Sequence, residues 1–196
     1  LEKNAPMNRL LEGDVGSGKT VVATMAMLET VKQGYQAVIM APTEILAHQH
    51  FEEVSKMLSP FKVKIGLITH SETKLDKKKI SKKKLLEKIA KGDIEIIIGT
   101  HALIQDELEF KNPALIIIDE QHRFGVEQRA KLNQKSKINP HYLTMTATPI
   151  PRTLALTLYS DLDLSIINEM PPGRQKVITK VVDPQDREKA YKFIKD

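Results

Sequence analysis

The residues best suited to chemistry form a glycine-rich stretch near the start of the chain. It consists of Gly13, Asp14, Val15, Gly16, Ser17, Gly18, Lys19 and Thr20, and it fits the pattern G-x-x-x-x-G-K-[ST]. The glycines allow backbone N–H groups to turn toward phosphate oxygens. The pattern predicts that Lys19 contacts the β- and γ-phosphates of a nucleoside triphosphate and that the Thr20 hydroxyl binds Mg²⁺. The alternative is an ordinary glycine-rich turn between a strand and a helix.

A second candidate group is the acidic pair Asp119 and Glu120, which follows the apolar run Leu115–Ile118. Two adjacent carboxylates at the end of a buried strand repel each other and lose solvation, so packing does not favour them. Asp119 is predicted to bind Mg²⁺, and Glu120 to orient or deprotonate the attacking water. With Lys19, Glu120 is therefore a candidate catalytic residue. The alternative is an exposed turn after the strand.

Apolar strands and amphipathic helices alternate along the chain and must position these residues. The predicted strands cover residues 8–11, 37–40, 63–69, 94–98, 115–118, 142–145 and 164–167, and the predicted helices cover 21–32, 44–58, 74–91 and 152–159. Alternation of this kind predicts an α/β fold with a mostly parallel sheet and helices on both faces. Ligands bind such sheets at the carboxyl ends of the strands. Both candidate groups lie at such ends.

Length and composition restrict the class of protein. The 196 residues suffice for one domain with a sizeable core, and the formal net charge of +5 permits a polyanionic partner. Aromatic residues make up only 5% of the chain, so a face built on base stacking is not expected. The absence of cysteine excludes disulfides and thiolate metal sites, and a cytoplasmic location is expected. A start at Leu1 rather than Met suggests a piece of a longer chain.

Lysines and histidines provide weaker signals. Nine lysines lie between Lys74 and Lys91, and they indicate either the solvated face of a helix or a patch that contacts phosphates. His48 and His50 are two residues apart on a predicted helix and therefore face different ways. With no third ligand apparent, a zinc site is not expected there.

The last part of the chain has a different organisation. Residues 171–175 are predicted to be a linker after a first domain covering 1–170, and 177–182 are predicted to form a strand. Asp183 and Pro184 are suited to cap a final helix. Residues 176–196 are therefore predicted to begin a second domain.

Four motifs resemble those of superfamily 2 helicases. Asp119–His122 resembles motif II in its DExH form, and Thr146–Pro149 resembles motif III. Ala41–Ala47 resembles motif Ia, and Gly99–His101 lies where motifs Ib and Ic contact the nucleic-acid backbone. The longer strings, residues 119–126 and 145–154, look like the RecG family of bacterial branched-DNA helicases.

The resemblance implies a RecA-like P-loop lobe of an ATP-dependent DNA helicase, with ATP and Mg²⁺ as cofactors and branched or forked DNA as partner. It implies that nucleotide state is relayed to the DNA site by a coupling group, His122, Thr146, Ala147 and Thr148. It also implies a DNA track of Pro42, Thr43, Thr100 and His101. An adenine-reading segment and a wedge domain are expected upstream, and a second RecA-like lobe with an arginine finger downstream.

Other functions are less well matched. The motor lobe of a transcription-repair coupling translocase shares the string from Thr146 to Leu154, but it usually has Glu where this chain has Gln121 and lacks Pro171–Arg174. A nucleotide-gated binding module without hydrolysis is disfavoured by Glu120. A small-molecule phosphotransferase would need an acceptor pocket and a lid, and neither is visible in the sequence.

Overall fold

The computed structural model describes residues 6–120, 139–148, 162–169, 179 and 181–195. The strands in these ranges are β1 (Asn8–Gly13), β2 (Gln36–Met40), β3 (Ile65–Ile68), β4 (Thr73–Leu75), β5 (Lys78–Lys79), β6 (Ile96–Gly99), β7 (Pro113–Asp119), β8 (His141–Thr146) and β9 (Asp163–Ile167). The helices are α1 (Lys19–Lys32), α2 (Glu44–Met57), α3 (Lys82–Lys91) and α6 (Arg187–Lys195), with the 3-10 helices η1 (His101–Ile104) and η3 (Pro184–Asp186).

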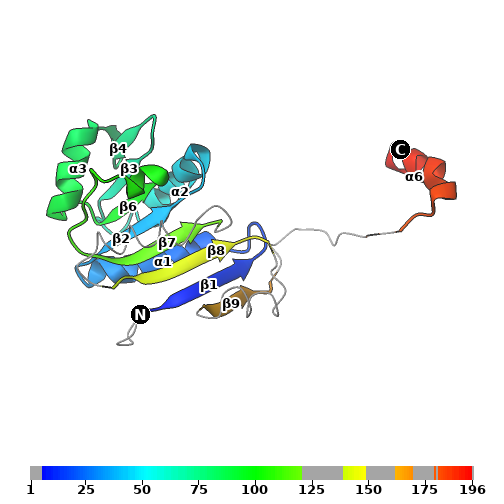
Figure 1. Cartoon of the computed structure of the whole chain (residues 1–196), viewed down its shortest axis with the longest axis horizontal. Helices are drawn as coiled ribbons and strands as arrows, with labels where there is room; N and C mark the ends of the chain where they lie inside the picture. Colours follow the sequence, from blue (N-terminus) through cyan, green and yellow to red (C-terminus); the bar gives the residue numbers. More distant parts are fainter. Residues whose placement is uncertain (1–5, 121–138, 149–161, 170–178, 180, 196) are drawn as a thin grey trace.

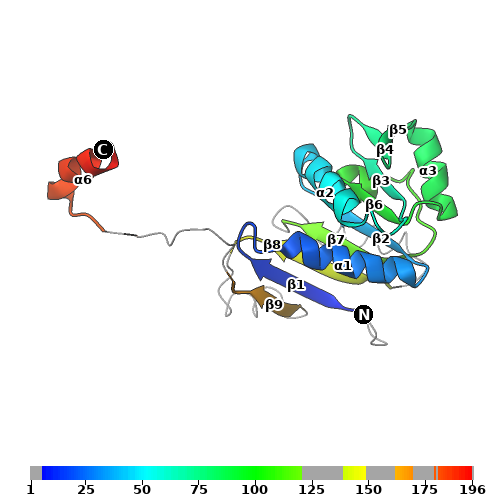
Figure 2. The same cartoon turned by 180° about the vertical axis from the view of Figure 1, so that it is seen from behind.

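The strands form one sheet in the order β5-β4-β3-β6-β2-β7-β8-β1-β9. All neighbouring strands are parallel except the pairs β3–β4 and β4–β5, which are antiparallel. Helices α1 and α2 cover one face of the sheet, while α3 and η1 pack on the other (Figures 1 and 2). The predicted α/β fold with a mostly parallel, doubly covered sheet is confirmed.

The central strands are buried on both faces, which explains their nearly continuous apolar sequences. In β2, Ala37 and Ile39 join the core beneath α1 and α2, whereas Val38 and Met40 join the core beneath α3. This two-sided burial fixes the strand register, because a shift by one residue would exchange the two faces. The carboxyl ends of the parallel strands are thereby held at one edge. No helix in the described part of the chain is long and apolar enough to cross a membrane.

The predicted helix from Lys74 to Lys91 is wrong in its first half. Residues Thr73–Lys79 form the short hairpin β4–β5, and the helix begins only at Lys82. Asp76 occupies the turn with φ 52°, a left-handed conformation that Asp tolerates better than most residues. Its carboxylate accepts from the Ile65 N–H at 3.1 Å, which fixes the turn against the start of β3.

The end of the chain matches the predictions only in part. The predicted strand at 177–182 is wrong where it can be tested, since residues 179, 181 and 182 belong to no strand. The Asp183 carboxylate accepts from the Gln185 N–H at 3.1 Å and so caps η3 ahead of α6, as predicted. Helix α6 lies apart from the sheet (Figures 1 and 2). The predicted helix at 152–159 and the linker at 171–175 lie outside the described residues.

Candidate functional site

The strand order divides the functional edge of the sheet into two adjoining halves. The strands β7, β8 and β1 are neighbours, and they end at the acidic pair, the Thr146–Thr148 segment and the glycine-rich loop respectively. The strands β6 and β2 are also neighbours, and they end at Thr100 and at Ala41. Because β2 pairs with β7, the two halves meet in the middle of the sheet.

The glycine-rich loop curls around the side chain of Lys19. The ammonium group donates to the carbonyl oxygens of Gly13 at 2.7 Å and Asp14 at 3.0 Å. Gly16 and Gly18 have φ values of 80° and 96°, which favour glycine, and no side chain caps the N-terminus of α1. The uncapped first turn of a helix is suited to bind an anion.

Asp119 and Glu120 are held in different ways. One carboxylate oxygen of Asp119, Oδ2, accepts from Nε2 of His50 at 2.7 Å. Glu120 has φ 52°, an unfavourable backbone conformation for a residue of this type, and it follows β7 directly. Its N–H donates to the Met145 carbonyl at 3.0 Å, so pairing with β8 fixes this conformation.

The Thr146–Thr148 segment contacts the acidic pair directly. The Ala147 N–H donates to Oε1 of Glu120 at 3.1 Å. The hydroxyls of Thr146 and Thr148 lie 2.9 Å apart, and the Thr148 N–H donates to the Thr146 hydroxyl at 3.2 Å. A displacement of this segment would therefore move the Glu120 carboxylate.

The side chains at this edge fit a magnesium nucleotide. The Ser17 hydroxyl is buried in the loop and has no hydrogen-bond partner among the described residues, so it is suited to meet a phosphate oxygen. Mg²⁺ prefers oxygen ligands and is usually held by one or two side chains together with phosphates and water. The hydroxyl of Thr20 and the carboxylate of Asp119 meet that requirement. In the described ranges, no group of three or more His, Asp or Glu side chains could hold a metal by itself.

The predicted DNA-track residues come together at the ends of β2 and β6. The Ala41 N–H donates to the Gly99 carbonyl at 2.8 Å, which joins the two ends. A Cβ atom on Gly99 would lie 2.3 Å from the Ile68 carbonyl oxygen, so this close approach requires glycine. Thr43 and His101 are exposed, whereas Thr100 is buried with 8% exposure.

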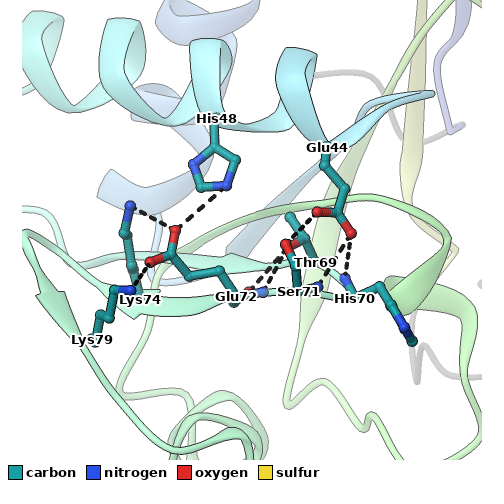
Figure 3. Close-up of polar contacts among 8 residues, drawn as sticks. All are labelled: Glu44, His48, Thr69, His70, Ser71, Glu72, Lys74 and Lys79. Atoms are coloured by element: carbon teal, nitrogen blue, oxygen red, sulfur yellow. Dashed lines mark hydrogen bonds and ion pairs between the residues drawn. The ribbon is translucent and has the colours of Figure 1, made fainter.

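Helix α2 begins beside this track and is fixed there by its first residues. The Thr43 hydroxyl accepts from the Leu46 N–H at 3.3 Å and caps the helix, as predicted. The Glu44 carboxylate accepts from the N–H groups of His70 at 3.1 Å and Ser71 at 3.2 Å, and also from the Ser71 hydroxyl (Figure 3). The Ser71 hydroxyl is the main cause of a lowered pKa of Glu44. These bonds hold the loop after β3 against α2.

Glu72, in the same loop, collects positive side chains. Its carboxylate lies 2.8 Å from the ammonium of Lys74, 2.9 Å from that of Lys79 and 3.5 Å from the His48 ring (Figure 3). Hydrogen bonds from Lys74 and then Lys79 lower the pKa of Glu72 to about 2. These two lysines of the cluster therefore have a local structural role.

Replacing Glu72 with glutamine is expected to destabilise the protein in a pH-dependent way. The pKa of Glu72 is about 2 in the folded state, against 4.5 without these contacts. The glutamate therefore contributes stability above the higher value and loses it as the pH falls toward the lower one. The melting temperatures of the wild type and Glu72→Gln, measured from about pH 7 to about pH 3, should converge as the pH falls. A difference between the two melting temperatures that does not change with pH would contradict the ion-pair assignment.

Most of the predicted site residues lie where the sequence placed them, at neighbouring strand ends. His122 lies outside the described residues, so its predicted coupling role cannot be compared with the structure. The sequence does not predict the role of His50, because it indicates only that His50 and His48 face different ways on a helix. It lies 69 positions before Asp119, and no local pattern indicates that contact.

A glycine-rich phosphate loop and an acidic strand end on one parallel sheet define a P-loop nucleotide-binding domain of the RecA-like type. The sequence profile of the DEAD/DEAH box helicases matches residues 3–157, and the chain belongs to this family. Among curated proteins, it is 54% identical to the ATP-dependent DNA helicase RecG of Aquifex aeolicus over 100% of this chain and 24% of that protein. It is 56% identical to the RecG of Streptococcus pneumoniae over 89% of this chain and 25% of that protein. The resemblance to RecG found in the motifs is confirmed.

Solved structures agree with these similarities. The chain superposes on RecG bound to a three-way DNA junction with a TM-score of 0.76 and 42% identity, covering 98% of this chain and 25% of that one. A DEAD box protein from Methanococcus jannaschii, at 22% identity and a TM-score of 0.59, shares the fold over 82% of this chain and 46% of that one. The chain spans about a quarter of the length of the curated relatives described above.

Proposed function

We propose that this chain is the ATP-binding lobe of an ATP-dependent DNA helicase or translocase that remodels replication forks and Holliday junctions in repair and recombination. The observation that carries the proposal is the shared edge of the sheet, where the nucleotide half and the DNA-track half adjoin between β7 and β2. The names of the RecG relatives support DNA as the substrate, and the three-way junction in the RecG structure supports branched DNA.

The nucleotide half is assigned to Mg-ATP. The loop from Gly13 to Thr20 receives the phosphates through its backbone, and Lys19 places a positive charge against them. Thr20 and Asp119 supply the protein oxygens for Mg²⁺, which when bound neutralises charge on the phosphates. Glu120 orients the attacking water and accepts its proton.

The other half is assigned to the DNA backbone. Thr43 and His101 present short polar groups at strand ends, with Pro42 and Thr100 beside them. Contacts of this kind bind phosphate and sugar without reading sequence, as a motor that moves along DNA requires. The bond between Ala147 and Glu120 connects hydrolysis to the segment Thr146–Thr148, and His122 completes the coupling group.

The domain organisation follows the same assignment. Residues 1–170 form the first RecA-like lobe, 171–175 the linker, and 176–196 the start of the second lobe of the same intact protein, which also carries the wedge domain. Closure of the two lobes on ATP would complete the active site, and hydrolysis would reopen it. We place the enzyme in the cytoplasm, with DNA. The motor of a transcription-repair translocase is not favoured, since the curated relatives described above are RecG helicases.

ATP hydrolysis by the intact protein is expected to be stimulated by DNA, and most strongly by forks. The physical reason is that both halves of the sheet edge belong to one motor, so DNA on the track stabilises the hydrolysing state. Turnover should be measured with single strands, duplexes and forks of equal length, at several salt concentrations because phosphate contacts weaken with salt. Turnover that no DNA changes would contradict the assignment to a DNA motor.

A further inference from the structure

His50 lies in the middle of α2, facing the sheet. The residue is 6% exposed, and its Nε2 lies 2.7 Å from Oδ2 of Asp119. A carboxylate can only accept, so Nε2 carries the hydrogen. The imidazole thereby occupies one oxygen of Asp119 and leaves Oδ1 for a metal ion.

Stability alone does not account for a histidine at this position. The second ring nitrogen, Nδ1, is buried and has no hydrogen-bond partner among the described residues. A buried polar atom without a partner costs free energy that an apolar side chain of similar volume would not. Within the described part of the chain, the ring forms its hydrogen bond with Asp119, which points to a role at that carboxylate.

Helix α2 links this contact to the DNA track. Thr43 caps the helix, and Glu44 binds the loop after β3, so the first turn is fixed beside the track. His50 lies six residues after Glu44, about 9 Å further along the helix axis. A helix of this length moves as a rigid element, so a shift of its first turn displaces the imidazole.

We propose that His50 is a positioning residue that orients the Mg²⁺-binding carboxylate of Asp119 and makes that orientation depend on the position of α2. DNA bound at Thr43 would then act on the metal ligand through a single helix. The proposal rests on the proposed function, since it assigns DNA to the track and Mg-ATP to the adjoining half. Outer-shell hydrogen bonds of this kind orient metal ligands, and their loss typically weakens metal binding about 10- to 100-fold.

The test uses His50→Leu and His50→Gln in the intact protein. Glutamine retains an N–H donor that reaches Asp119, and leucine does not. The matched control is His48→Gln, which changes the partly exposed histidine of the same helix. Binding of a fluorescent ADP analogue is measured against Mg²⁺ concentration and also in EDTA, and ATP turnover is measured with and without forked DNA.

For His50→Leu, the Mg²⁺ concentration at half-maximal binding should rise about tenfold or more, with binding in EDTA unchanged. The stimulation by forks should fall several-fold, while His50→Gln recovers most of both and His48→Gln resembles the wild type. If the leucine variant does not fold, His50→Asn, whose amide is too short to reach Asp119, replaces it.

Wild-type Mg²⁺ dependence and fork stimulation in a folded His50→Leu variant would overturn the proposal. Equal losses in His50→Leu and His50→Gln, with a lowered melting temperature in both, would also overturn it and indicate a packing role. Failure of the proposed function gives a different result, because the wild type would then show no DNA-stimulated turnover. Binding of the ADP analogue is measured without DNA. Its dependence on Mg²⁺ concentration would therefore still show whether His50 orients Asp119.

Discussion

Replacing Lys19 with alanine is expected to weaken ATP binding by about tenfold to a hundredfold and to abolish turnover. In the structure, the Lys19 ammonium donates to the carbonyls of Gly13 and Asp14, so it is already held inside the curl of the loop. There it would face phosphate oxygens, and a hydrogen bond between charged groups contributes about 1.5–3 kcal/mol. Affinity is measured by titrating the intact protein with a fluorescent ATP analogue in the presence of Mg²⁺.

The control for Lys19→Ala is Lys32→Ala, which removes a lysine from the other end of the same helix. Lys32 is exposed at the last residue of α1, whereas the loop lies at the start of this helix. The Lys32 ammonium lies 5.9 Å from the centre of the Phe61 ring. This variant should bind ATP like the wild type. Unchanged affinity in a folded Lys19→Ala variant would refute the phosphate-loop assignment.

Local sequence patterns predicted the parts of the site that depend on local geometry. A tight loop between a strand and a helix needs glycine at fixed positions, and Gly16 and Gly18 do have positive φ values. The end of a buried strand is recognisable from its apolar run, so the sequence alone places Asp119 at the functional edge. Thr43 is predictable as a cap because threonine is among the residues whose side chain preferentially accepts from the free N–H groups of a helix N-terminus.

Contacts between distant segments could not be predicted in the same way. His50 reaches Asp119 only because the tertiary fold brings α2 to the carboxyl end of β7, and nothing local to either residue indicates this contact. The β4–β5 hairpin was missed for a related reason. Apolar residues at near-helical spacing favoured a helix through Lys74, whereas Glu72 and the turn at Asp76 stabilise a hairpin. Tertiary pairing overrode local propensity there.

Replacing Glu120 with glutamine is expected to leave ATP binding intact and to reduce turnover by about a hundredfold to ten-thousandfold, the range typical for loss of a general base. Glutamine has nearly the shape of glutamate and retains a side-chain oxygen that can accept from the Ala147 N–H. In the structure, this N–H donates to Oε1 of Glu120 at 3.1 Å. The substitution therefore removes the proton acceptor and keeps the connection to the Thr146–Thr148 segment. Binding is measured with the fluorescent analogue, and turnover by phosphate release, both in the intact protein.

Glu120→Ala separates the two roles assigned to this carboxylate. Alanine removes both the base and the acceptor for Ala147, so it should lose turnover like Glu120→Gln and should also weaken the mutual effect of ATP and DNA on each other's binding. Both variants replace the same residue, whose backbone has φ 52°, so they form a matched pair that differs only in the side chain. Glu109→Gln, an exposed acid before β7, is the control for loss of charge. If Glu120→Gln retained wild-type turnover, another group would have to be the base, and Glu120 would remain only as the connection between β7 and the Thr146–Thr148 segment.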